Sequence, residues 1–207
     1  MAITFPLSMT GLKTPRSIKP MRNSVVAGSA SPFTGSQQIY AHAGQWWSAQ
    51  VQLPPMNRAD AQKWLGFLGS LNGREGTFLM GLDPKHTTPL GTATGTPLVK
   101  GGSQTGNVLT TDGWTTGVTG ILKAGDFIQL GSGSSSTLHQ VLTDANSDGI
   151  GEAVLDIWPA IRTAPADNAA ITISSPVGLF RLADNENGWD LDLAGIFGMS
   201  FSCIEAF

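Results

Sequence analysis

The sequence predicts a mainly β protein with one packed helix and a small inserted β-barrel or sandwich. The composition supports this, because 26 of the 207 residues are glycine and only 13% are charged, about half the usual share of ~25%. Glycine together with many Thr and Ser residues is typical of tight turns between short strands. Apolar residues alternate with period two in several segments, whereas helical spacing is sustained only over residues 58–71.

The N-terminal stretch is interrupted by Pro6, Pro15 and Pro20. Because proline cannot donate to a β-ladder, these positions predict edge strands or an extended segment. Four basic residues recur here at every third position, and an extended chain does not collect that spacing on one face: Lys13, Arg16, Lys19 and Arg22. A solvated or partner-facing segment is therefore favoured over a nucleic-acid patch.

Residues 24–55 predict two strands joined by the turn-rich sequence SASPFTGS at 29–36. In the second strand one face carries Trp47, Ala49, Val51 and Leu53, and Trp46 lies on the opposite, wetter face. This alternation indicates a strand with one buried side. Trp46 is a candidate exposed aromatic, either an anchor between subunits or at an edge, or a stacking platform for a sugar or base.

The helix predicted at 58–71 has Asn57 as its N-cap and Asn72-Gly73 as its stop signal. Its apolar residues follow the i, i+3, i+4, i+7 pattern of a one-sided helix: Ala61, Trp64, Leu65, Leu68 and Leu71. We expect this stripe to pack on the sheet rather than to form a binding groove.

Residues 86–173 change to Gly- and Thr-rich sequence with five or six short strands, which predicts a separate small barrel or sandwich. The segment 174–207 then returns to hydrophobic strands, with a hairpin signal at 185–188, Asn-Glu-Asn-Gly. We expect it to add strands to the sheet formed by residues 1–85.

The segment 144–152, DANSDGIGE, matches the first half of a calcium-binding loop. Asp144, Asn146 and Asp148 are the candidate calcium ligands, but position twelve is Leu155 instead of the bidentate glutamate. Asp, Asn and Gly are also the residues of a hairpin turn, so a turn is favoured over a metal site.

No other motif predicts chemistry. The three histidines lack metal-ligand spacing, and Cys203 stands alone in an apolar segment. A single cysteine excludes an internal disulfide and is typical of a reducing compartment, and we expect a buried, inert thiol. The sequence therefore predicts no catalytic residues, no cofactor and no enzyme activity.

Charge is distributed unevenly along the chain. Residues 1–85 carry eight basic and three acidic side chains, residues 86–171 three and seven, and residues 172–207 one and five. These charges either neutralise each other within one chain or let a basic end of one copy face an acidic end of another. No apolar run approaches the ~20 residues of a membrane span, and the N-terminus lacks the charged region of a signal peptide, so neither membrane insertion nor secretion is expected.

The order of these elements resembles the distal tail proteins of long-tailed bacteriophages and gene-transfer particles. The resemblance rests on three segments in sequence: residues 31–81, which contain the Trp46-Trp47 strand and the helix; residues 120–131; and residues 138–162 with the closing strands. It is a likeness of layout over nearly the whole chain.

This resemblance implies a β-sandwich ring domain, 1–85 with 174–207, and an inserted OB-like barrel, 86–173. It implies a structural protein of the virion tail tip, present in the host cytoplasm during assembly, that forms a ring, typically of six copies. The ring would contact the tail tube protein and the tail hub or tip protein and leave a channel through which DNA passes without specific binding. The alternatives are a carbohydrate-binding module that uses Trp114 or Trp158, and a tail-tube or terminator subunit.

Overall fold

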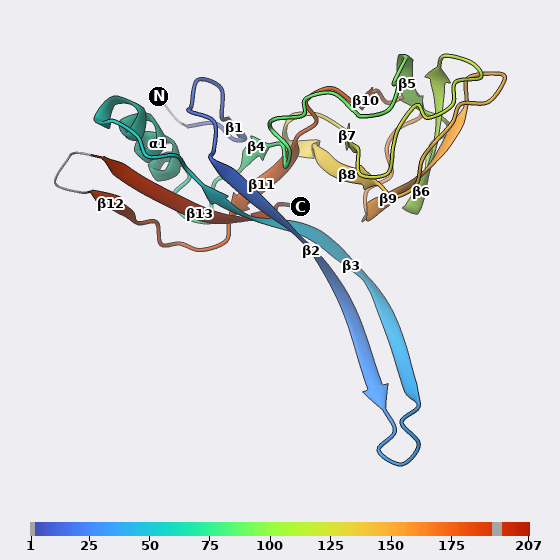
Figure 1. The fold of residues 1–207 in the computed structure, drawn as a ribbon, viewed down its shortest axis with the longest axis horizontal. Helices are drawn as coiled ribbons and strands as arrows, with labels where there is room; N and C mark the ends of the chain where they lie inside the picture. The colour runs from blue at the N-terminus through green and yellow to red at the C-terminus, as the bar shows by residue number, and fades with distance from the viewer. Residues whose placement is uncertain (1–2, 192–195) are drawn as a thin grey trace.

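The computed structural model of the 207-residue chain describes residues 3–191 and 196–207. It is mainly β, with 44% of residues in strands and 8% in helix. Two sheets and one α-helix make up the body, and a long two-stranded ribbon projects away from it (Figure 1). The predicted class, mainly β with one packed helix, is confirmed.

The first sheet combines strands from both ends of the chain, in the order β1-β4-β11-β13-β3-β2, with β12 paired to β13. Its strands are β1 (Leu7–Ser8), β2 (Ser17–Ala30), β3 (Gln37–Gln52), β4 (Phe78–Met80), β11 (Gly178–Leu182), β12 (Trp189–Leu191) and β13 (Phe197–Glu205). Strands β1 and β2, which lie in the proline-interrupted N-terminal stretch, occupy the two ends of this order, as the sequence predicts. Strand β13 lies between β11 and β3, so the C-terminal segment completes a sheet that the N-terminal segment begins.

Helix α1 (Arg58–Ser70) covers this sheet and begins where the sequence predicts. The Asn57 side chain accepts a hydrogen bond from the Asp60 backbone N–H, at 3.0 Å, and so caps the first turn. Asn72 and Gly73 adopt positive φ angles of 49° and 66° directly after the helix, which ends it.

The helix packs through aromatic rings. Trp64 is fully buried and its ring centroid lies 5.9 Å from that of Phe201 on β13. Phe67 is buried as well, 5.7 Å from Phe78, whereas the stripe residue Leu65 is only half-buried. Phe67, which the predicted stripe omits, therefore replaces Leu65 on the buried face, because the sheet covers an arc of the helix shifted toward position 67.

The second sheet consists of residues between 95 and 172, in the order β10-β7-β8-β9-β6-β5. Its strands are β5 (Gly95–Val99), β6 (Gly106–Trp114), β7 (Phe127–Leu130), β8 (Thr137–Val141), β9 (Ala153–Ile161) and β10 (Ile171–Thr172). Backbone hydrogen bonds from Val99 N to Ala169 O and from Asn168 N to Val99 O bring its two ends together. The sheet is therefore nearly barrel-shaped, and its interior holds a separate cluster of buried apolar residues that includes Leu109, Ile128 and Ile157.

The hairpin predicted at 185–188 is wrong. Strands β11 and β12 both run antiparallel to β13, with Leu182 opposite Cys203 and Trp189 opposite Met199. The chain therefore runs in the same direction before and after 185–188, and β13 runs opposite to both strands. Asn185 instead accepts a hydrogen bond from the Arg74 backbone N–H at 3.2 Å, so this turn sequence holds the segment after α1.

In residues 3–191 and 196–207, no helix has the length and apolar character needed to cross a membrane.

Candidate assembly surface

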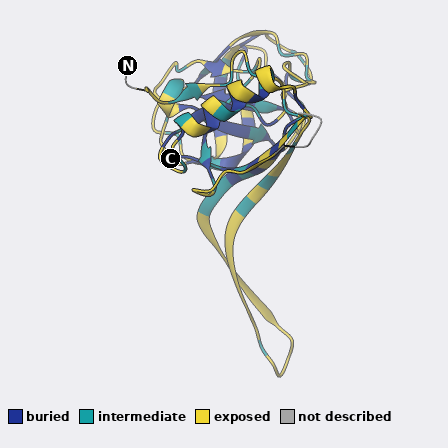
Figure 2. Cartoon of the chain, turned by 90° about the vertical axis from the view of Figure 1, so that its left-hand side faces the viewer, coloured by how far each residue is buried: buried dark blue, intermediate teal, exposed yellow. Residues whose placement is uncertain are grey.

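The projecting ribbon consists of residues 24–43 of β2, β3 and their connecting turn, and is called here the β2–β3 arm. Every residue in it is exposed except the half-buried Ser31 (Figure 2). The turn is held by hydrogen bonds from Gly35 N to Ser31 O, 3.0 Å, and from Ser31 N to Ser36 O, 2.9 Å. An isolated two-stranded hairpin is at best marginally stable in water and needs a further strand or a packed layer to support it. Residues 24–43 are exposed on both faces, so the described part of the chain supplies no such support to the β2–β3 arm.

The β2–β3 arm carries no Asp, Glu, Lys or Arg. Its first face is largely aliphatic, because Val26 pairs with Ala41, Gly28 with Ile39, and Ala30 with Gln37. The other face carries Tyr40 opposite Ala27 and Gln38 opposite Ser29. Val26 and Ile39 are more than half exposed, although both are residues that normally avoid water.

Phe33 lies at the tip of the β2–β3 arm and is 95% exposed. It follows Pro32 in the turn, where hydrogen bonds from Phe33 N and Thr34 N to the Ser31 hydroxyl fix the backbone. The described residues of the chain contain no large apolar side chain more exposed than this one. An aromatic ring presented at the end of a neutral ribbon is typical of a contact residue.

Trp46 lies at the base of the β2–β3 arm and is half-buried. It is paired with Asn23, whose side-chain amide donates to the Trp46 carbonyl at 3.3 Å. The ring edge lies beside Gly44, where a Cβ atom added to the glycine would be 3.8 Å from Cζ3 of Trp46. Trp46 therefore lies where the β2–β3 arm meets the body, and its role between subunits stays a prediction.

The neighbouring Trp47 faces inward and joins the two sheets. Its ring meets that of Trp158 on β9 edge-on, with centroids 4.5 Å apart, and its Nε1–H donates to the Leu138 carbonyl on β8 at 3.0 Å. Trp158 is thus a core residue. Arg22 stacks over the same two rings and donates to the Gln140 side chain.

A charged pair fixes the same junction. The Glu205 carboxylate on β13 is 5% exposed, and it accepts hydrogen bonds from Trp47 N and from the Arg162 guanidinium, both at 3.0 Å. Burial raises the pKa of Glu205, while the hydrogen bond from Trp47 and the charge of Arg162 oppose the increase. Arg162 also donates to the Gln45 carbonyl at 2.7 Å and lies over the Phe207 ring. These contacts attach the base of the β2–β3 arm to β13 and to Arg162, which follows β9.

His139 is buried close to this pair. Its Nδ1 lies 2.8 Å from the Pro159 carbonyl and its Nε2 lies 2.9 Å from the Thr137 hydroxyl. Burial lowers the pKa of His139 to about 4. The neutral ring therefore donates to Pro159 and accepts from Thr137, which is a structural arrangement that leaves neither nitrogen available as a base.

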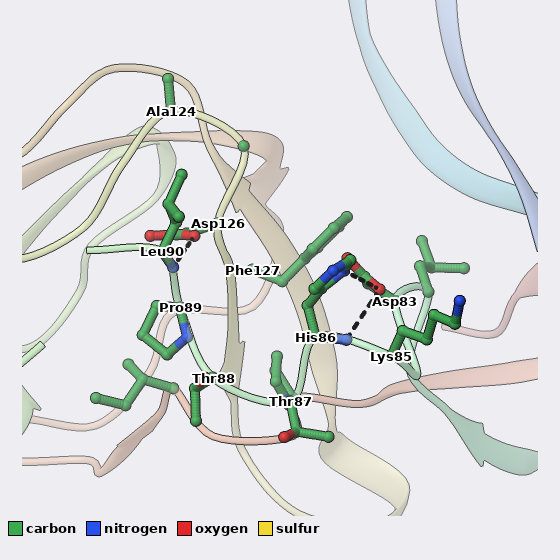
Figure 3. Close-up of a pocket in the computed structure, with 14 residues that line it drawn as sticks. Asp83, Lys85, His86, Thr87, Thr88, Pro89, Leu90, Ala124, Asp126 and Phe127 are labelled. Atoms are coloured by element: carbon green, nitrogen blue, oxygen red, sulfur yellow. Dashed lines mark hydrogen bonds and ion pairs between the residues drawn. The ribbon is translucent and has the colours of Figure 1, made fainter. Parts of the chain in front are cut away.

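Two segments connect the sheets, residues 81–94 between β4 and β5 and residues 173–177 between β10 and β11. Residues of both segments line a pocket of about 550 Å³ (Figure 3). The Asp126 carboxylate accepts hydrogen bonds from the backbone N–H groups of Leu90, Gly91 and Lys123. His86 is exposed and paired with Asp83 at 2.9 Å. A hydrogen bond from Ser175 N to Thr87 O joins the two connections. The polar groups here hold the connecting segments in place.

The side-chain oxygens of the three calcium candidates each accept hydrogen bonds from other groups of this chain. Asp144 accepts from the Lys123 ammonium and from Ala124 N, Asn146 accepts from Gly120 N, and Asp148 accepts from Ile150 N and Glu152 N. These hydrogen bonds lower the pKa of Asp144 and of Asp148, in Asp144 chiefly through Lys123. In residues 3–191 and 196–207 no group of three or more His, Cys, Asp or Glu side chains is arranged to hold a metal ion.

The remaining candidates from the sequence are buried. Trp114 and Trp158 are 4% and 7% exposed, so neither presents a face to a sugar. Cys203 lies on β13 within the first core, where burial raises the pKa of its thiol to about 12. The thiol is therefore protonated and inert at neutral pH.

Comparison with known proteins adds no relative, since no family model and no curated protein matches this chain.

The sequence patterns described above predict neither the projection of the β2–β3 arm from the body nor the ion pair between Arg162 and Glu205. A signal for the first exists, because residues 23–57 contain no Asp, Glu, Lys or Arg. A charge-free segment rich in small residues with a two-strand pattern is a poor solvent-facing ribbon and a suitable contact surface. No sequence signal identifies the second, because its members lie far apart in the chain and only the fold brings them together.

Proposed function

We propose that this chain is a structural virion protein that forms a closed ring, of six copies by its resemblance to distal tail proteins, at the distal end of a phage tail. In this role the first sheet with helix α1, residues 1–85 and 174–207, is a β-sandwich ring domain, and residues 86–173 form an OB-like insertion. The ring joins the tail tube protein to the hub or tip protein and leaves a channel for DNA.

The observation that carries this proposal is the β2–β3 arm. It is a neutral, exposed ribbon with an aliphatic face and an aromatic tip. The contacts of Trp47 and Glu205 attach its base to the body. Such a surface is suited to permanent contact with other protein, which buries it and supplies the missing layer. Its lack of cations makes it unsuited to binding phosphate groups, which agrees with a channel through which DNA passes without specific contacts.

The glycan-binding alternative has less support, since Trp114 and Trp158, its candidate platforms, are buried. The tail-tube and terminator alternatives share the same class of surface and differ in the position of the protein along the tail.

Co-assembly tests the proposal. The purified chain is mixed with candidate tube and hub proteins from the same source, and complexes are separated by density-gradient sedimentation and imaged by negative stain. We expect a ring between tube and hub, and we expect Trp46→Ala to weaken ring formation while leaving the fold intact. A protein that remains outside such complexes and instead retains glycans on an array would contradict the proposal, and a position elsewhere in the tube would favour the tube or terminator role.

A further inference from the structure

The body carries an apolar groove far from the β2–β3 arm. It has a volume of about 370 Å³ and lies between the segment joining β1 to β2 and the strand β4. Its apolar walls are the half-buried side chains of Met9, Leu12, Ile18, Leu79 and Val177. Met9, Leu12 and Ile18 also pack against the first core. Lys13 is the one charged residue among the described residues that line the groove.

The groove and the tip of the β2–β3 arm lie at opposite ends of the same strand. Ile18, in the groove, is near the start of β2, and Ala30, next to the tip, ends it. At ~3.3 Å per residue these two positions are about 40 Å apart along the strand. Because β2 is paired with β3 along its whole length, the tip cannot fold back into the groove of its own chain.

We propose that the Phe33 ring at the tip of the β2–β3 arm docks into this groove on a second copy of the chain. The inference rests on the proposed function, because it specifies the subunit contact of the proposed ring. The contact is head-to-tail, since a donor and an acceptor at opposite ends of one molecule make a heterologous interface. Repetition of such an interface closes into a ring when the rotation between copies permits it.

The chemistry of the two surfaces matches. The tip sequence SASPFTGS is uncharged, and the groove walls are methionine, leucine, isoleucine and valine side chains. A phenyl ring is the large apolar group on the β2–β3 arm that protrudes furthest, and a groove of this volume has room for it together with the adjoining turn atoms. Methionine and leucine walls adapt readily to an aromatic ring.

Other occupants fit less well. A nucleic acid needs cations, which the β2–β3 arm lacks. A bilayer would leave the backbone N–H and C=O groups along both open edges of the ribbon unpaired, which hydrocarbon does not tolerate. A second copy of this chain supplies both a groove with apolar walls and a polypeptide surface for those edges.

Cysteine cross-linking in the full-length chain tests the contact. The variant carrying both Thr34→Cys, which leaves the Phe33 ring in place, and Leu12→Cys is oxidised mildly at high protein concentration and run on a non-reducing gel. We expect a ladder of covalent multimers, because each chain donates one cysteine and accepts another. The native Cys203 does not compete, since it is buried and its thiol is protonated.

The matched control pairs Thr34→Cys with Leu90→Cys, because Leu90 is strongly exposed but lies outside the groove. We expect no ladder from it beyond Thr34→Cys dimers. In a chain without the engineered cysteines, Phe33→Ala should weaken self-association by about 10- to 100-fold, the effect of losing one buried aromatic ring. Leu90→Ala should leave self-association unchanged.

Equal ladders from the two cysteine pairs, no ladder from either, cross-linking of Thr34→Cys to a different protein, or Phe33→Ala that associates like the wild type would each overturn the docking. These outcomes separate the inference from the proposed function. A ring that still forms on tails without the cross-link keeps the function and removes the contact. A ladder from a protein absent from tails keeps the contact and removes the function.

Discussion

Replacing Arg162 with methionine should destabilise the fold more than replacing its partner Glu205 with glutamine. Arg162→Met leaves the Glu205 carboxylate buried, with the Trp47 backbone N–H as its remaining hydrogen-bond donor among the contacts described. Breaking a buried ion pair in this way costs about 3–5 kcal/mol. Because the Arg162 side chain is 31% exposed, solvent screening reduces the cost below this range, to about 2–3 kcal/mol.

Glu205→Gln keeps the shape and an acceptor for Trp47 N–H, and it removes the cost of burying a charge, so we expect a loss of about 1 kcal/mol. In the double variant no charge is left unpaired. Its loss should therefore be about 1–2 kcal/mol, smaller than that of Arg162→Met alone. The contacts of Arg162 with Gln45 and Phe207 are lost in both arginine variants, so they cancel in the double-mutant cycle.

Urea unfolding followed by tryptophan fluorescence measures these free energies, because Trp47 and Trp158 lie at the junction. The pH dependence provides a control. Burial raises the pKa of Glu205, and a raised carboxyl pKa means that stability is lost as pH rises through it. Arg162→Met should therefore recover part of its loss on moving from neutral pH toward pH 5. A double variant at least as unstable as Arg162→Met, or an Arg162→Met loss independent of pH, would refute this reasoning.

Three further predictions concern stability. His139, with its pKa lowered to about 4, takes up a proton more readily when unfolded, so stability should fall as pH drops from about 6.5 to 4, by up to about 3 kcal/mol; in His139→Gln this part of the acid loss, measured by urea unfolding at each pH, should disappear, and an unchanged pH profile would contradict the assignment. Asn57→Ala should cost about 1 kcal/mol through the lost N-cap, whereas Asn57→Ser should retain most of the stability, as measured by urea unfolding. Equal losses in the two variants would contradict the assignment of this stability to the cap. The melting temperature should be the same in calcium and in chelator, since the oxygens of the 144–148 turn already accept hydrogen bonds from this chain; a rise with calcium would restore the metal site.

The local patterns of the sequence predict much of this fold because they depend on neighbours along the chain. Asn57 caps the helix, and Trp47 alternates with Ala49 into the core, by short-range rules that the fold does not override. The turn at 185–188 shows the opposite case. Asn and Gly there satisfy the preferences of a hairpin, yet β13 pairs with both β11 and β12 and keeps the chain running in one direction.

The candidate surface was only partly predictable, because its exposure depends on strands that are distant in the sequence. Whether Trp46 and residues 24–43 are covered depends on the strands available beside them, and the first sheet ends at β2. The Arg162–Glu205 pair and the groove beside Leu12 are formed by segments far apart in the chain. Residue spacing therefore identifies the strands, whereas the fold determines which of their residues remain exposed.

The most direct test of the proposed ring is electron microscopy of the purified chain assembled with the tail tube protein proposed as its partner. We expect a closed ring at the distal end of the tube, of six copies by resemblance, with each β2–β3 arm in contact with the body of a neighbouring copy. Single copies with a free β2–β3 arm, or a ring in which residues 24–43 contact no other subunit, would contradict it.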